Sequence, residues 1–191
     1  MAEDGDVTRS VAISLPLADD AALVREAASD PARFGTLYRL YADDLYRYLF
    51  SRCGDETDAE DLVAETFLAA FRSARTYRGT GPVKAWLVGI ARRKAADAHR
   101  GKRAHLALDA IAALADPVRT DDLALQRVEL ARVLAITERL APDRAEALRL
   151  RYFAGLECDE IAPLLGRSEA AVKMLVHRAL SDLRERLEAT T

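Results

Sequence analysis

The 191-residue sequence has little of what stabilises extracellular or metal-bound proteins. It holds two cysteines, Cys53 and Cys158, which lie far apart and outside any CxxC spacing. We therefore expect neither a disulfide nor a zinc site, but two free thiols in a reducing compartment. No apolar run approaches the ~20 residues that cross a membrane, and the acidic start MAEDGDVTRSVAIS lacks the apolar stretch of a secretory signal. The sequence predicts a globular protein of the cytoplasm with no membrane contact of its own.

Signatures of catalysis are also missing. The sequence contains no GxSxG, P-loop or HExxH motif. Its three histidines, His99, His105 and His177, have no partners at metal-ligand spacing. The acids between residues 58 and 65 could suggest a carboxylate metal site, but acids at a helix start are expected from the helix dipole alone. We expect a protein that is not an enzyme and that needs no metal or other cofactor.

A formal net charge of −3 conceals a strong separation of charge along the chain. Residues 1–66 hold 6 Lys and Arg against 15 Asp and Glu, whereas residues 67–103 hold 10 against 1. The basic segment can bind a polyanion while the acidic segment binds a basic partner. The alternative is that both charge runs are solvated helix faces without a partner.

Helical periodicity runs through almost the whole sequence, so the predicted fold class is all-α. Sustained strand-type alternation is absent from the sequence. Asp30 before Pro31 is a predicted N-cap, and Thr57 with Glu60 forms a predicted capping box. The expected helices cover about 20–28, 31–53, 58–71, 82–100, 121–140, 142–153, 158–165 and 168–187.

Apolar spacing predicts which helix faces are buried. The expected core residues of the first three long helices are Phe34, Leu37, Tyr38, Tyr41, Leu45, Leu49, Leu62, Val63, Phe67, Ala70, Phe71, Trp86, Leu87 and Ile90.

The stretch GLECDEIAPLLGRSEAAVKMLVHRAL (155–180) has the pattern of a helix-turn-helix. Two short helices meet at Gly166, and Ser168 suits the N-cap of the second. Val172, Leu175 or Val176 would pack inward, which leaves the cations outward, as a helix in the major groove requires. A helical hairpin without DNA contact would show much the same pattern.

The basic segment 67–103 mixes cations with aromatic residues, as single-strand binders do. Cations neutralise phosphates, and an aromatic ring can stack on an unpaired base. Trp86 is in register with Ile90 and is interpreted as a core residue. Tyr77, beside Gly79 and Gly81, is equally consistent with the core and with base stacking.

Three segments in order, DAEDLVAETFLAAF (58–71), YRGTGPVKAWLVGIARRKAADAHR (77–100) and 155–180, are similar to those of bacterial extracytoplasmic-function (ECF) sigma factors of the sigma-70 family. The resemblance covers about residues 20–188. It implies two small helical domains, a region 2 bundle of three or four helices and a region 4 helix-turn-helix, joined by a flexible linker. The implied boundaries are a disordered N-terminus (1–18), region 2 (19–100), the linker (101–120) and region 4 (121–188).

The resemblance also implies a function and the residues that perform it. The chain would bind the clamp helices of core RNA polymerase, recognise the −35 and −10 elements of promoter DNA, and aid promoter melting. An anti-sigma factor is a further implied partner. The implied polymerase-binding residues are Asp58, Asp61, Ala64 and Glu65. The implied −10 residues are Tyr77, Arg78, Lys84, Arg92, Arg93 and Arg100. The implied −35 residues are Arg167, Ser168, Lys173, Met174, His177 and Arg178.

Several positions depart from the family pattern. Ala64 stands at a frequent Gln position and Arg93 at a frequent Asn position, while Met174 and Leu175 replace a frequent Ser-Arg pair. Pro163 inside the helix 158–165 predicts that this helix is kinked or short.

Two other functions fit parts of the same pattern. A helix-turn-helix repressor would bind duplex DNA without polymerase, and a helical adaptor would bind protein alone. The acidic helix at 58–71 favours the sigma factor over the repressor, and the basic segment 67–103 disfavours the adaptor. Leu106, Leu108, Ile111 and Leu114 make the linker unusually apolar, so packing of the linker between the domains is an alternative route to inhibition.

Overall fold

A computed structural model describes residues 20–27, 30–77, 79, 81–106 and 121–189, and within these ranges every regular element is a helix. The first bundle contains α1 (Asp20–Ala27), α2 (Pro31–Cys53), α3 (Glu56–Ser73), the 3₁₀ turn η1 (Ala74–Thr76) and α4 (Val83–Leu106). The second contains α5 (Asp121–Glu138), α6 (Pro142–Leu148), the π-helical turn η2 (Arg149–Phe153), α7 (Cys158–Leu165) and α8 (Glu169–Glu188). The predicted all-α class of two helical units is confirmed.

The first bundle forms because α1, α2, α3 and α4 each bury one apolar face against the others. Leu37, Leu45 and Leu49 of α2 lie in its core. The predicted inner face is wrong at two positions, since Tyr38 and Phe71 are 48% and 38% exposed. Both rings lie at the edge of the core, where Tyr38 packs on Phe67 and Phe71 on Phe34. Trp86, predicted as core, is half-buried and packs against Tyr77.

The second bundle contains the predicted helix-turn-helix, α7 and α8, which pack against each other. Gly166 ends α7 with φ +62°, a left-handed conformation that favours glycine. The Ser168 side chain accepts a hydrogen bond from Ala171 N–H at 3.2 Å, so the predicted N-cap is confirmed. The helix around Pro163 has 8 residues and is short, as that proline predicts.

Two local predictions are wrong. Helix α3 begins two residues earlier than expected, with Asp55 in place of Thr57 as its N-cap, and the Asp55 carboxylate accepts a hydrogen bond from Asp58 N–H at 2.8 Å. Left-handed Gly54 ends α2 immediately before, so Asp55 is the first residue free to cap. The helix expected over 142–153 is α-helical to Leu148 and then widens, because Ala154 N–H bonds to the Arg149 carbonyl five residues back.

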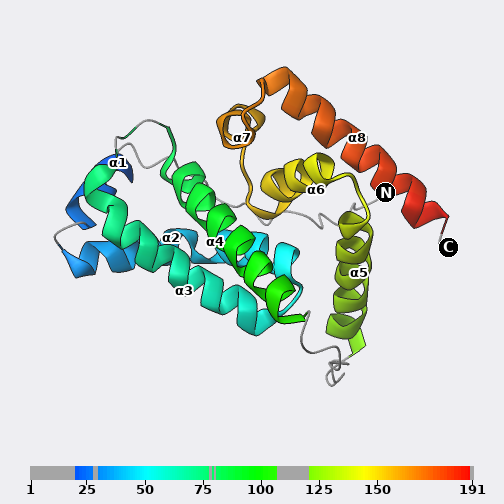
Figure 1. Cartoon of the computed structure of the whole chain (residues 1–191), viewed down its shortest axis with the longest axis horizontal. Coiled ribbons are helices and arrows are strands. Elements are labelled where there is room, and N and C mark those ends of the chain that lie inside the picture. The colour runs from blue at the N-terminus through cyan, green and yellow to red at the C-terminus, as the bar shows by residue number, and fades with distance from the viewer. Residues whose placement is uncertain (1–19, 28–29, 78, 80, 107–120, 190–191) are drawn as a thin grey trace, which may run out of the picture.

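The two bundles pack directly on each other, with α7 beside α4 and η2 beside α2 (Figure 1). Ala147, Leu150, Leu156 and Ile161 of the second bundle belong to the same buried apolar cluster as the first bundle's core. The approach is close at Gly89 of α4, where an added Cβ would lie 3.3 Å from Leu164 Cδ2. The closed arrangement is therefore a packed interface.

The segment expected to link the domains is described in part. Helix α4 continues to Leu106, beyond the expected end near Arg100, and α5 begins at Asp121. Residues 107–120 lie outside the described residues, as do residues 1–19. We predicted that the apolar linker residues Leu106, Leu108, Ile111 and Leu114 pack between the domains. For the side chains of all four residues this stays a prediction.

The corrected start of α3 gives a stability test. Asp55→Ala should lower the free energy of unfolding by about 1 kcal/mol, because Asp58 N–H loses its acceptor. Thr57→Ala is the matched control and should leave the free energy nearly unchanged, because alanine suits an exposed position in the first turn. Urea denaturation of both variants measures the difference. A larger loss for Thr57→Ala would show that Thr57 is the cap after all.

Candidate polymerase and nucleic-acid interfaces

The middle of α3 presents an acidic face to solvent. Asp61, Ala64 and Glu65 are exposed and lie three and four residues apart, so they share one side of the helix. Val63 and Phe67 on the opposite side hold the helix against the core. Asp58, one turn earlier, is half-buried.

Leu68 extends the same face and was missed by the sequence analysis. It follows Glu65 by three residues, and 50% of its surface is exposed. The sequence did contain a signal for it: Leu68 is a large apolar residue whose helical spacing places it beside Asp61 and Glu65, and not beside the buried residues of the helix. An acidic stripe that ends in an exposed leucine is suited to a basic and apolar protein partner.

The predicted −10 residues fall into two groups on α4. Arg93 and Arg100 lie seven residues apart, on one side of the helix, and both are exposed. Arg100 pairs with Asp97 on the same surface. Arg78 lies outside the described residues. Arg93 and Arg100 are placed where phosphates could reach them.

Lys84 and Arg92 form the other group and face the second bundle. Lys84 Nζ lies 2.6 Å from an Asp44 carboxylate oxygen and 3.4 Å from the Gly155 carbonyl oxygen. Arg92 donates from Nε to Glu146 at 3.0 Å and from a terminal nitrogen to the Leu164 carbonyl at 2.8 Å. Both cations are therefore occupied by the protein's own oxygens.

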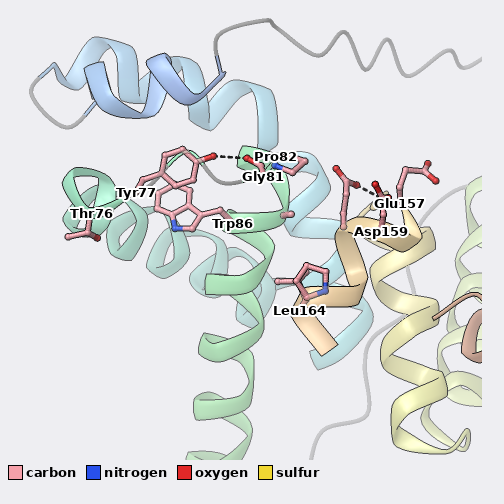
Figure 2. A pocket seen from close by; sticks show the side chains of 11 residues that line it. Thr76, Tyr77, Gly81, Pro82, Trp86, Glu157, Asp159 and Leu164 are labelled. Carbon is pink, nitrogen blue, oxygen red and sulfur yellow. Dashed lines mark hydrogen bonds between the residues drawn. The ribbon is translucent and has the colours of Figure 1, made fainter. Parts of the chain in front are cut away.

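A groove of about 590 Å³ runs between the start of α4 and α7 (Figure 2). The aromatic rings of Tyr77 and Trp86 lie on one side, with ring centroids 4.8 Å apart, and Glu157 and Asp159 lie on the other. The Tyr77 hydroxyl donates to the Gly81 carbonyl at 2.9 Å, which fixes the ring. The aromatic side suits an unpaired base, whereas the acidic side repels its phosphate.

The first half of α8 carries a mixed basic and apolar face. Val172, Val176 and Ala179 are buried, so Lys173, Met174, His177 and Arg178 point outward and are exposed. Met174 is 49% exposed. The side-chain hydrogen bond from Lys173 to Glu169, 2.6 Å in length, raises the pKa of Lys173. Arg167, just before the helix, pairs with Asp143 at 2.7 Å.

A buried polar cluster joins the bundles around Glu146 of α6. Its carboxylate accepts hydrogen bonds from the Tyr48 hydroxyl at 2.9 Å, from Arg52 and from Arg92. Burial, and then the charge of Glu146, raise the pKa of Tyr48, so the phenol remains a donor. Arg149 adds a bond from its Nε to the Ser51 carbonyl at 3.0 Å.

Metal and membrane sites find no support in the described part of the chain. Within it, no group of three or more His, Cys, Asp or Glu residues is arranged to hold a metal ion. No described helix has the length and apolar character needed to cross a membrane.

Two family models match the chain, in the order of its two bundles. Sigma-70 region 2 matches residues 37–105, and Sigma-70 region 4 matches residues 130–183. The ECF RNA polymerase sigma factor SigX of Bacillus subtilis is 30% identical over 162 residues, which are 81% of this chain and 84% of SigX. The ECF RNA polymerase sigma factor BldN of Streptomyces coelicolor is 37% identical over 83% of this chain, which spans 62% of BldN.

Solved structures agree with the sequence matches. CnrH, solved in complex with the cytosolic domain of CnrY, superposes with a TM-score of 0.72 at 28% identity and covers 90% of this chain and 99% of its own. The sigma factor RpoE of Bartonella quintana, solved with the anti-sigma factor NepR, shares the fold, with a TM-score of 0.67 at 23% identity over 81% of this chain and 96% of its own. Two helical bundles that match sigma-70 regions 2 and 4 in order place the chain among two-domain transcription initiation factors. The chain belongs to the ECF sigma factors of the sigma-70 family.

Proposed function

We propose that this sigma factor binds core RNA polymerase through the α3 face and directs it to promoters through α8 and α4. The acidic stripe of Asp61 and Glu65, with Leu68 beside it, meets the clamp helices of the polymerase. The observation that carries the proposal is that the α3 face and the basic face of α8 are exposed on separate bundles of one chain. Two partners can therefore be bound together.

Helix α8 is the proposed reader of the −35 element. Its outward residues Lys173, His177 and Arg178 lie on one face and can reach phosphates or base edges in a major groove. Met174 replaces a polar residue of the family pattern and offers an apolar contact to a thymine methyl group. Leu175 is half-buried and packs against the core, so it belongs to the fold more than to the DNA contact.

The start of α4 and the turn before it are proposed to hold the −10 element as a single strand. Extruding a base costs a few kcal/mol. Stacking on Tyr77 or Trp86 and phosphate contacts with Lys84, Arg92, Arg93 and Arg100 would offset that cost. The role requires binding and not covalent chemistry, so we propose that the protein is not an enzyme.

A protein inhibitor, an anti-sigma factor, is the third proposed partner. CnrH, which covers nearly all of this chain, was solved with a bound protein, the cytosolic domain of CnrY. The proposed partners, polymerase and promoter DNA, place the work of the protein in the bacterial cytoplasm.

Gel-shift assays with and without core polymerase test the proposed function. We expect weak, sequence-independent DNA binding by the free protein and tight, specific promoter binding with polymerase, because a single reading helix on a net acidic chain makes few contacts. A repressor would bind its site specifically alone, and an adaptor would bind no DNA under either condition. Either result would contradict the proposal.

Charge reversal tests the docking face. Asp61→Arg combined with Glu65→Arg should weaken polymerase binding by about tenfold or more, because like charges then face the partner. The control is Glu185→Arg with Glu188→Arg, which makes the same charge change at exposed positions of α8. Binding is measured by titration of labelled protein with core enzyme, after circular dichroism shows that both variants fold. Equal binding by the two variants would place the docking surface elsewhere.

Alanine substitution tests the reading helix. Arg178→Ala should cost about 1–3 kcal/mol of promoter binding by the polymerase complex. Arg184→Ala, which removes the same charge from an exposed position further along α8, should change binding little. The comparison uses one promoter and a copy with a scrambled −35 element. If scrambling leaves wild-type binding unchanged, α8 does not read the −35 element.

A further inference from the structure

Glu146 is a buried carboxylate whose partners all come from the other bundle. Tyr48 and Arg52 of α2 and Arg92 of α4 donate to it, while Glu146 itself lies on α6. A buried charge is costly unless ion pairs and hydrogen bonds offset its lost hydration. Separation of the bundles would remove all three donors at once. In the closed arrangement these donors take the place of the water that would hydrate the carboxylate if the bundles separated.

The same contacts use a cation that the proposed function assigns to DNA. Arg92 is held by Glu146 and by the Leu164 carbonyl, which take two of the five N–H donors of its guanidinium and turn the group toward the second bundle. A phosphate must therefore compete with Glu146 for the Nε donor of Arg92. Lys84 differs, because its ion pair is with Asp44 of its own bundle.

The rest of the interface supports closure without touching the DNA-facing side of α8. Arg149 reaches the Ser51 carbonyl across the interface at 3.0 Å. Leu150 and Leu156 are fully buried in the shared apolar cluster. Lys173, His177 and Arg178 stay exposed. Closure therefore affects the −10 side of the molecule selectively.

We propose that the Glu146 cluster is an autoinhibitory latch, in which α6 holds the free protein closed and withholds Arg92 from single-stranded DNA. The latch acts within one chain and needs neither an anti-sigma factor nor the apolar linker. Its DNA-binding consequence rests on the proposed role of α4, whereas the closure itself does not. Opening the latch frees Arg92 from both of its contacts with the second bundle, whereas Lys84 stays paired with Asp44.

Glu146→Gln tests the latch in the full-length protein. The amide keeps the size of the side chain but removes the charge that holds Arg52 and Arg92. Small-angle scattering should show a larger radius of gyration than wild type. Affinity of the free protein for a short single-stranded oligonucleotide of randomised sequence should rise about tenfold, because a larger fraction is then competent to bind.

The matched control is Asp182→Asn. Asp182 pairs with Arg144 at 2.6 Å between α8 and α6, so this variant also removes one negative charge from a half-buried ion pair, but within the second bundle. It should change neither the radius of gyration nor, beyond the effect of one charge, the DNA affinity. The difference between the two variants isolates the contact between bundles.

Arg52→Gln is a second variant of the same cluster, for use if Glu146→Gln does not fold. Arg52 is less buried than Glu146, so its substitution disturbs the core less. It removes a positive charge, which by itself would weaken DNA binding, so a gain in affinity would support the latch strongly. An unchanged radius of gyration in both folded variants would overturn the latch. Expansion without tighter DNA binding would overturn the masking of Arg92.

Failure of the proposed function can be distinguished from failure of the latch. If the proposed function is wrong, the wild-type protein does not direct core polymerase to any promoter. The latch is tested separately, because the scattering measurement uses neither polymerase nor DNA.

Discussion

The charge of Glu146 is the constraint on which the arrangement of the whole molecule depends. A carboxylate at this depth needs cations, and its own bundle supplies none of the donors that it uses. The donors come from two helices of the other bundle, so one side chain fixes α6 against both α2 and α4. Leu150 and Leu156 are fully buried in the same interface, whereas the side chains of Arg52 and Arg92 remain 24% and 41% exposed.

This constraint divides the functional surfaces of the protein into two kinds. The α3 and α8 faces lie away from the interface, so their use costs no rearrangement. The proposed −10 surface is split: Arg93 and Arg100 face solvent, while Lys84 and Arg92 face the second bundle. In the groove, the acids of α7 lie opposite the rings of Tyr77 and Trp86. If α4 holds the −10 element as proposed, the closed and DNA-bound forms compete for Arg92 on the same face of α4.

Sequence reasoning predicted the features that depend on neighbours along the chain. The N-caps Asp30 and Ser168, the C-cap Gly166 and the two helices of the helix-turn-helix all follow from local spacing, and the structure has them. The failure at Thr57 was also local, because two capping candidates lay two residues apart and the end of α2 at Gly54 decided between them.

The interface was beyond prediction for a different reason. The donors to Glu146 lie 98, 94 and 54 residues away in sequence, and no periodic pattern encodes a pairing at such distances. Arg92 was correctly placed within a basic helix, but nothing in its surroundings indicated an acidic partner in the other bundle. The family of each bundle could be inferred from the sequence, while their mutual contact required coordinates.

Gly89 gives the closed form an unusual evolutionary property. Helices α4 and α7 approach there as closely as they do because α4 has no side chain at that position, and a methyl group would already press on Leu164. If closure silences the protein as proposed, a single codon change at Gly89 would shift the balance between silent and active protein by a small step. Residues that bind polymerase or DNA would be untouched, so a lineage could adjust the threshold of a regulon while keeping its promoters and its polymerase contacts intact.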